Sequence, residues 1–577
     1  MENNIYDNSN ISESYAGVTT PLTFSFVKRV YKGVYEHFSI LMGVGRKTIN
    51  SQEDIFSNMV EYIGGRIYYN LNNWYKMLSF FPGYKFSGEF MEKMMGVERR
   101  NSQKIEKTQG TFLRYLLYFP KTIFQSIKIS YTFYSLTWEI NRFNDYFDKI
   151  YQDIEKISLK NMNARELRDH YLYIEAKLLS KWKIPIANDF AVMVSAGLSD
   201  KLFKRWLGSK NAYAHMKTNI NKPLVSLNPG DEIMRIVNLI NNDKRMKQIF
   251  LKENAQTVFN KIKHDAPETQ ISKEIDYYLD KFGSRMPNEL KLETLTLKEA
   301  PVELIVLLKK IIENEGNQEK SYLANVEPRE HDKLPWPKRL ILNKLVIWAG
   351  NSMYRREETR FRRTLIFGHV RKIFLAIGSC LKERSMIEKQ RDIFFLTMEE
   401  IFSLDEGKCN KKNYLKSIIK KRKQKQKRWR NFELPRRIET QKNVVTVEKD
   451  LIEGNLKSES VERKKTAGDV ASKPTKEKVF TGVALTMKEF DSTADFKGKI
   501  LITKQTDPGW TMIFPLLKGI VVEKGGMLSH AAVVARELRI PCIIGARGAT
   551  CNFSTGERVA IDLELGSITK IDRNNNV

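Results

Sequence analysis

The segment Gly519–Gly545 constrains the fold more than any other part of this 577-residue chain. A β-branched run ends at Gly525 and Gly526, and Ser529, His530 and an alanine- and valine-rich stretch follow before a second β-branched run. Glycine permits a sharp turn at the end of a strand, and serine is a favoured N-terminal cap of a helix. The segment therefore predicts a strand–turn–helix–strand unit, with His530 at the surface where the helix begins.

The pattern of apolar residues changes once along the chain. Between about residues 54 and 402 they recur at three- and four-residue spacing, which is typical of helices, whereas short β-branched runs separated by Gly, Pro, Asp and Asn begin near residue 467. We therefore expect a multidomain chain: a mainly α-helical N-terminal domain over 1–403, a basic helical extension over 404–439, a linker over 440–466, and a C-terminal α/β domain over 467–573.

The net charge of +29 is compatible with nucleic acid, an anionic membrane surface, an acidic protein or a phosphorylated substrate, and does not choose among them. Eight of the eleven residues from Lys420 to Arg430 are basic, which we interpret as a solvated helix. We see no signal peptide and no apolar run long enough to cross a bilayer, and the four cysteines are scattered. These features predict a cytoplasmic protein with no metal site.

The segment around His530 resembles the signature of the phosphoenolpyruvate (PEP)-utilising enzymes. The family pattern GG-x-x-S/T-H-A-A-x-V-A-R-E-x-x-I-P is matched almost completely from Gly525 to Pro541, and a second family element, T-D-P-G-W, stands at Thr506–Trp510. Within the family the chain looks more like rifampicin phosphotransferase and its PEP-synthase-like relatives. The resemblance implies that residues 467–573 are a phosphohistidine swivelling domain.

The resemblance also implies site residues in this domain. His530 would be the catalytic residue that carries phosphate, since a neutral imidazole is a competent nucleophile and a helix start favours an added anion. The phosphohistidine loop would comprise Thr506, Asp507, Gly525, Gly526, Ser529 and Arg536.

A weaker resemblance extends into the helical region. Phe282-Gly-Ser-Arg-Met-Pro-Asn-Glu289 and Arg356-Glu-Glu-Thr-Arg360 follow in the order of the family's acceptor-binding domain, although Ser284 stands where the family commonly has His. The resemblance implies phosphate or acceptor contacts from Arg285, Glu289, Arg356 and Arg360. Arg356 and Arg360 are one helical turn apart and would present two guanidinium groups on one face; the alternative is a solvated or salt-bridged helix face.

The family's enzymes charge their histidine with an ATP-grasp domain, but the printed sequence starts at the acceptor-like region and shows no glycine-rich phosphate loop. We therefore expect no cofactor on this chain, and ATP and Mg²⁺ on a separate ATP-grasp protein of the pyruvate phosphate dikinase type. The leading hypothesis is a phosphotransferase component that passes phosphate from that partner, through His530, to a small-molecule acceptor. The alternatives are a non-catalytic binding or regulatory relative and, ranked last for want of any recognition signature, a nucleic-acid-binding protein.

Overall fold

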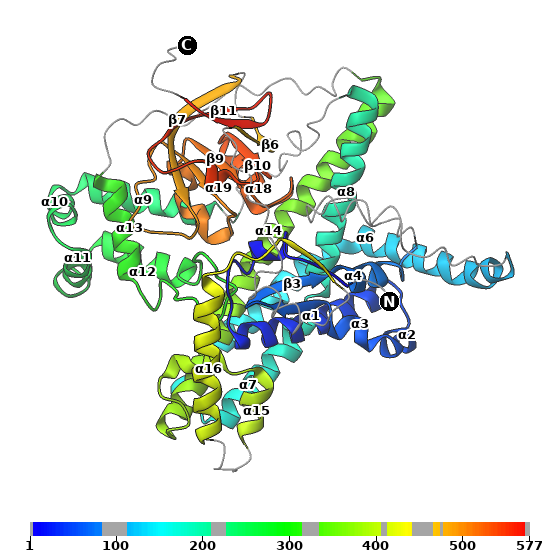
Figure 1. Ribbon diagram of the computed structural model, residues 1–577, viewed down its shortest axis with the longest axis horizontal. Helices are drawn as coiled ribbons and strands as arrows, with labels where there is room; N and C mark the ends of the chain where they lie inside the picture. Colours follow the sequence, from blue (N-terminus) through cyan, green and yellow to red (C-terminus); the bar gives the residue numbers. More distant parts are fainter. Residues whose placement is uncertain are drawn as a thin grey trace. The chain divides into compact units, whose positions relative to one another are not determined.

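The protein is described by a computed structural model. It covers residues 4–82, 112–208, 225, 227–313, 334–405, 412–440, 465–473 and 477–571 (Figure 1). The chain forms two compact units. Unit 1 comprises residues 1–197, 290–293 and 365–458, and unit 2 comprises residues 198–289, 294–364 and 459–577.

Unit 1 is mainly helical. Its helices begin at residues that favour a helix start: Pro21 opens the first, and Asn163 and Glu166 form a reciprocal capping box at the start of another. The helices are α1 (Pro21–Leu41), α2 (Arg46–Ser51), α3 (Glu53–Ser57), α4 (Leu71–Leu78), α6 (Phe112–Glu155), α7 (Ala164–Lys177), most of α8 (Lys183–Leu207), the second part of α14 (Trp336–Glu383), α15 (Met398–Phe402) and α16 (Lys412–Arg430). Short 3-10 helices are η1 (Ile11–Glu13), η3 (Leu159–Asn161), η4 (Leu179–Lys181), η8 (Gln390–Phe395) and η9 (Ser403–Asp405).

A small antiparallel sheet joins distant parts of unit 1. Its strand order is β2-β3-β1-β4, formed by β1 (Asn4–Asp7), β2 (Val60–Ile63), β3 (Arg66–Asn70) and β4 (Arg437–Thr440). The predicted helical extension over 404–439 is therefore helical only in α16, because its last residues pair with β1 as a strand. The predicted linker over 440–466 lies largely outside the described residues.

The basic helix α16 is anchored to unit 1 by part of its charged sequence. Arg422 donates hydrogen bonds to both carboxylate oxygens of Glu400, and the Trp429 ring packs edge-on against Tyr62, with 5.8 Å between the ring centroids. Lys420 and Lys421 are exposed. The basic run is thus partly solvated, as expected, and partly structural.

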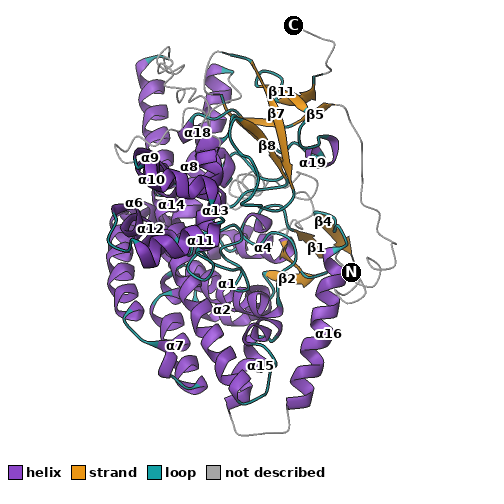
Figure 2. Ribbon diagram, turned by 90° about the vertical axis from the view of Figure 1, so that its left-hand side faces the viewer, coloured by secondary structure: helices purple, strands orange, loops and turns teal. Residues whose placement is uncertain are grey.

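The helices of unit 2 precede its sheet in the sequence. They are α9 (Asn228–Asn242), α10 (Lys244–Lys252), α11 (Ala255–Asn260), the π-helix η6 (Lys261–Asp265), α12 (Gln270–Phe282), α13 (Val302–Glu313) and the first part of α14. Their apolar side chains share one buried cluster with one face of the unit 2 sheet. Figure 2 shows the helices in purple and the strands in orange. The two units therefore do not follow the predicted division, since segments from within 1–403 group with the C-terminal domain.

Among the described residues, the sheet of unit 2 has eight strands in the order β5-β12-β11-β7-β8-β9-β10-β6, and its centre, β7-β8-β9-β10, is parallel. Successive side chains of a strand face opposite sides, and here both sides are buried: Ile520 and Val522 lie in the cluster with the helices, and Val521 lies in the cluster on the other face. The elements are β5 (Lys465–Ala467), β6 (Asp469–Ser472), β7 (Val479–Met487), β8 (Lys499–Thr503), η11 (Pro508–Leu516), β9 (Gly519–Val522), α18 (His530–Leu538), β10 (Cys542–Ile544), α19 (Ala549–Asn552), β11 (Arg558–Asp562) and β12 (Ser567–Lys570).

Among the described residues, one helix is long and apolar enough to cross a membrane by length and composition alone. It is α14, and 67% of its most apolar 18-residue window is buried in the structure. A buried core helix passes the same test, so a single helix of this kind is weak evidence for a membrane span.

Candidate active site around His530

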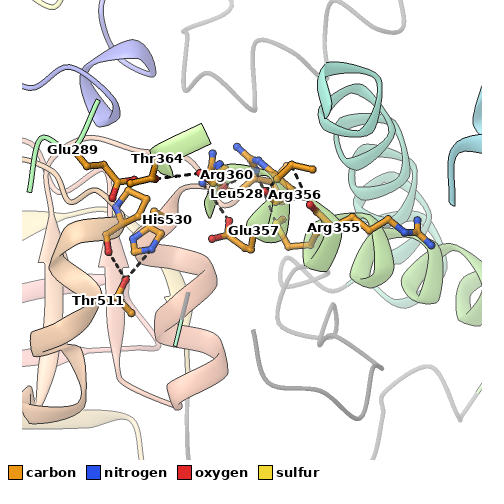
Figure 3. A network of polar contacts seen from close by, with 12 residues as sticks. Glu289, Arg355, Arg356, Glu357, Arg360, Thr364, Thr511, Leu528 and His530 are labelled. Carbon is orange, nitrogen blue, oxygen red and sulfur yellow. Dashed lines mark hydrogen bonds and ion pairs between the residues drawn. The ribbon is translucent and has the colours of Figure 1, made fainter. Parts of the chain in front are cut away.

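His530 is the first residue of α18, directly after the turn that follows β9, as the sequence predicts. The expected surface position was wrong, because only 1% of the residue is exposed. Two parts of unit 2 that are distant in sequence cover it. The Phe514 ring of η11 lies 6.0 Å from the imidazole between centroids, and Arg356 of α14 donates a hydrogen bond of 3.0 Å to the backbone carbonyl of Leu528 (Figure 3).

The turn before His530 is built by its glycines and closed by an arginine. Gly525 has a φ of 120°, a conformation that favours glycine, and the Gly526 carbonyl accepts from the Ser529 amide. Ser529 has the extended backbone of an N-cap, but its hydroxyl makes no capping hydrogen bond. Arg536 donates to the carbonyls of Ala532 and Met527. Arg536 therefore supports the loop from within α18.

The T-D-P-G-W segment packs directly against the Phe282–Glu289 segment. One oxygen of Asp507 accepts from the Gly509 amide at 2.9 Å, and the other accepts from the Asn288 amide at 2.6 Å. A Cβ on Gly509 would collide with the backbone of Met286 and Pro287. Thr506 is buried beside this contact. The two segments that the resemblance singled out independently are therefore neighbours.

Arg285 is the most buried cation of the site, with 1% of the residue exposed. Its Nε lies 3.7 Å from an oxygen of Glu289, and its guanidinium carbon lies 5.3 Å from the Phe361 ring centroid. None of its three nitrogens has a hydrogen-bond partner among the described residues. Since buried polar groups are nearly always hydrogen-bonded, this guanidinium has the capacity to bind an anion.

Arg356 and Arg360 lie on α14, and both side chains are largely buried, so this helix face is not solvated. The salt-bridged alternative does apply to Arg360, which pairs with Glu357. Between them lies Glu357, which is fully buried and forms an ion pair with Arg360 at 3.3 Å. Arg285, Arg356 and Arg360 all act electrostatically on His530. The structure thus gathers the four predicted phosphate- or acceptor-contact residues, Glu289 included, in the same unit as His530.

Burial lowers the pKa of His530 to about 3, and the three arginines act in the same direction, whereas Glu357 opposes them. Its imidazole is therefore neutral near pH 7. Burial alone would raise the pKa of Glu357, but the neighbouring arginines, Arg360 first and then Arg356 and Arg285, act against it, and the pKa lies below its usual value. Burial raises the pKa of Glu289. The site therefore combines a neutral imidazole with buried cations, an arrangement that is chemically suited to nucleophilic transfer of an anionic group.

Sequence reasoning missed three polar side chains of the site. Thr511 contacts His530, Glu357 forms the ion pair with Arg360, and Thr364 donates a hydrogen bond of 2.6 Å to Glu289. Glu357 lies inside the Arg356–Arg360 motif, and Thr511 directly follows the T-D-P-G-W motif. The position of these two residues beside known motifs could therefore have identified them. Among the described residues, no group of three His, Cys, Asp or Glu side chains could hold a metal ion.

Comparison with known proteins agrees with this geometry. Residues 495–566 match the family model "PEP-utilising enzyme, mobile domain", and residues 186–357 match "Rifampicin phosphotransferase fourth domain". The chain contains a PEP-utilising enzyme mobile domain. The two matches hold His530 and two of the arginines, Arg285 and Arg356, whereas Arg360 lies just beyond the second. The sequence predicts these residues in two separate domains, whereas the structure places them in one unit.

Among its relatives, the chain is 25% identical to the rifampicin phosphotransferase of Bacillus cereus over 443 residues, which are 70% of this chain and 46% of that protein. It is 23% identical to that of Bacillus subtilis, over 72% of this chain and 48% of that protein. It is 42% identical to the PEP synthase of Aeropyrum pernix over 86 residues, or 15% of this chain and 10% of that enzyme. The chain spans about half the length of the rifampicin phosphotransferases that it matches, so it is related to these phosphotransferases over part of their length.

Proposed function

We propose that this protein is a phosphotransferase component in which His530 carries a phosphoryl group from a nucleotide-binding ATP-grasp protein to a small-molecule acceptor. The observation that carries the proposal is the neutral imidazole of His530 at the start of α18, in the same unit as three buried arginines. A neutral ring nitrogen can attack phosphorus, and arginine is well suited to hold phosphate oxygens.

The transfer takes two displacements at phosphorus. In the first, a bond forms between an imidazole nitrogen and phosphorus, a phosphoanhydride bond of ATP breaks, and the phosphate oxygen of that bond takes the electron pair and leaves with the remaining part of the nucleotide on the partner. In the second, the N–P bond breaks, an O–P bond forms to the acceptor, and the proton of the acceptor hydroxyl is released. Arg285, Arg356 and Arg360 supply positive charge for the phosphoryl oxygens, which is the main contribution a protein makes to such a transfer.

The source of the phosphoryl group is part of the proposal. No glycine-rich nucleotide loop is visible in the sequence, and the two family matches concern the mobile domain and the fourth domain. We propose that ATP and Mg²⁺ bind to a separate ATP-grasp protein. We also propose a cytoplasmic location, where a partner protein has access to ATP.

The test uses the full chain, a purified ATP-grasp protein of this family and ATP labelled in its phosphates. We expect label on the chain only when both proteins are present. The adduct should be labile in acid and stable in alkali, because protonation of the ring makes it a better leaving group. His530→Ala should abolish the label, and His264→Ala, which changes an exposed histidine, should not. Label that persists in His530→Ala would overturn the proposal that His530 carries the phosphoryl group. Label that forms without the ATP-grasp protein would overturn the proposal that ATP binds to a separate partner.

Ser284 concerns only the second displacement, in which the phosphoryl group passes from His530 to the acceptor. It is the neighbour of Arg285 and stands where the family commonly has His. A non-catalytic or regulatory relative would accept phosphate on His530 and fail to pass it on. Chasing the labelled protein with candidate hydroxyl compounds, with wild-type protein and Ser284→His in parallel, separates these functions. Transfer by the wild-type protein supports the phosphotransferase, and transfer by Ser284→His alone supports the regulatory alternative.

A further inference from the structure

The end of α8 and the start of α14 pack against each other within unit 2. Phe203 of α8 shares a small buried cluster with Leu342 and Val346 of α14. Among the described residues, neither segment contributes to the larger cluster that lies against the sheet. We call residues 198–207 and 336–347 together the basic helix pair, and it forms a part of unit 2 with a small core of its own.

One face of α14 in the basic helix pair is apolar and exposed. Trp336, Leu340 and Ile347 are spaced by four and seven residues, so their side chains lie on the same face of the helix. Their exposed fractions are 71%, 48% and 42%, respectively. The buried cluster is filled from another face, by Leu342 and Val346. Neighbouring exposed apolar side chains of this size often mark a contact with another molecule.

The exposed charges of the basic helix pair are all positive. Six basic residues are exposed: Lys201, Lys204, Arg205, Lys338, Arg339 and Lys344. The one acidic residue of the two segments is Asp200, which is buried and forms an ion pair with Lys204 at 3.1 Å. At 100° per residue, Arg339 and Lys344 border the apolar face of α14 on its two sides. The pair therefore combines an apolar stripe with a positive border.

We propose that the basic helix pair docks on a membrane surface that contains anionic phospholipids. Tryptophan is favoured at the level of the lipid headgroups, aliphatic side chains enter the boundary with the acyl chains, and Lys and Arg attract the lipid phosphates. The net charge of +29 attracts the whole chain to such a surface. The contact is peripheral, because it uses the side chains of one helix face and requires no helix to cross the bilayer.

Two other partners match either the apolar stripe or the charges, but not both. A second copy of the chain would cover the stripe, but it would bring the same basic residues against each other. A single-stranded nucleic acid would match the charges and stack on Trp336. Leu340 and Ile347 have no ring on which a base can stack, whereas they suit the acyl boundary of a bilayer. An anionic lipid surface matches both features.

The first experiment measures sedimentation of the full chain with vesicles. Phosphatidylcholine vesicles with about a third phosphatidylserine are compared with vesicles of phosphatidylcholine alone, because the cytoplasmic leaflet is rich in anionic lipids. We expect strong binding only to the vesicles that contain phosphatidylserine. Binding should weaken as salt is raised from about 50 mM to about 500 mM, since salt screens the attraction between exposed charges.

The first variant removes three charges of the basic helix pair: Lys338→Gln, Arg339→Gln and Lys344→Gln. We expect it to weaken binding about a hundredfold, since each basic residue near an anionic surface contributes about fivefold. The matched control removes three exposed charges from the basic helix α16: Lys420→Gln, Lys421→Gln and Lys427→Gln. The control should weaken binding by less than about threefold. Circular dichroism checks that each variant is folded, and exposed substitutions of this kind rarely disturb a fold.

The second experiment tests whether Trp336 enters the lipid. The chain has eight tryptophans, so quenching of its fluorescence by brominated lipids is compared between wild type and Trp336→Phe. We expect quenching in the wild-type protein and its loss in Trp336→Phe, which keeps an apolar ring and should still bind. Trp336→Ser should weaken binding about tenfold, because it removes the apolar area that the lipid buries.

Each outcome supports or overturns the docking surface. Absence of binding to phosphatidylserine vesicles at low salt would overturn it, as would equal binding by the wild type and the three-charge variant. An equal loss in the α16 control would assign the binding to the net charge of the chain instead. Binding to single-stranded RNA without binding to vesicles, or self-association that the variants abolish, would assign the surface to the other partner. None of these outcomes depends on the phosphorylation of His530.

Discussion

Replacing His530 by Gln should flatten the dependence of stability on pH. Burial lowers the pKa of His530 to about 3, whereas a histidine in an unfolded chain has a pKa of about 6.5. The unfolded chain therefore binds the proton more readily, and acid favours unfolding. The contribution of the neutral His530 ring to the free energy of unfolding is fully present above about pH 6.5. It is lost as the pH falls from about 6.5 towards 3.

The size of this effect follows from the pH interval that is crossed. One pKa unit corresponds to about 1.4 kcal/mol, so lowering the pH from 7.5 to 5 should remove roughly 2 kcal/mol of stability through His530 alone. Only the part of this pH interval that lies below the pKa of histidine in the unfolded chain, about 6.5, contributes to the loss. The assay is urea unfolding at pH 7.5, 6 and 5, comparing wild type, His530→Gln and the exposed-residue control His264→Gln. The variant should lose about 2 kcal/mol less than the other two between the extremes. Parallel curves for all three proteins would show that His530 is not buried as a neutral ring.

Three further predictions concern packing and reactivity. Gly509→Ala should destabilise unit 2 by about 1–3 kcal/mol, measured by urea unfolding, because its Cβ would meet the rigid backbone of Met286 and Pro287; an unchanged midpoint would refute the close approach. Arg422→Ala should lower the melting temperature through the lost pair with Glu400, whereas Lys421→Ala, on the same helix but exposed, should change stability by less than about 0.5 kcal/mol. Burial raises the pKa of the Cys542 thiol to about 12, so at pH 8 iodoacetamide should modify the exposed Cys551 and spare Cys542, as mass spectrometry of the peptides would show; equal modification would contradict that burial.

The strands of the C-terminal domain could be predicted where their residues are apolar and β-branched. The run Val479–Met487 is β7, and the predicted helix after Gly525 and Gly526 is α18. In contrast, β5 and β6 were not predicted, because Lys465–Ala467 and Asp469–Ser472 are short and contain polar residues. Such strands are held by their neighbours in the sheet rather than by local preference.

Pairing between segments that are distant in the chain could not be predicted from local sequence patterns either. The segment Arg437–Thr440 follows a basic helix, and the sequence predicts it as part of that helical extension, but it pairs as a strand with Asn4–Asp7 near the start of the chain. The burial of His530 has the same origin. Its own segment predicts a surface turn, and the cover comes from η11 and from α14, which no local pattern connects to it.

The burial of so many charges around His530 is itself an argument about function. Arg285, Arg356, Arg360 and Glu357 are all largely buried, and removing ions from water costs more than their mutual attraction usually returns. Apolar residues of similar size would stabilise such a core at least as well. Arg285 adds to this cost, because none of its nitrogens has a hydrogen-bond partner among the described residues. This group of buried charges contributes little to stability, but its arginines are suited to holding an anion. We propose that this anion is a phosphoryl group on the neighbouring imidazole of His530.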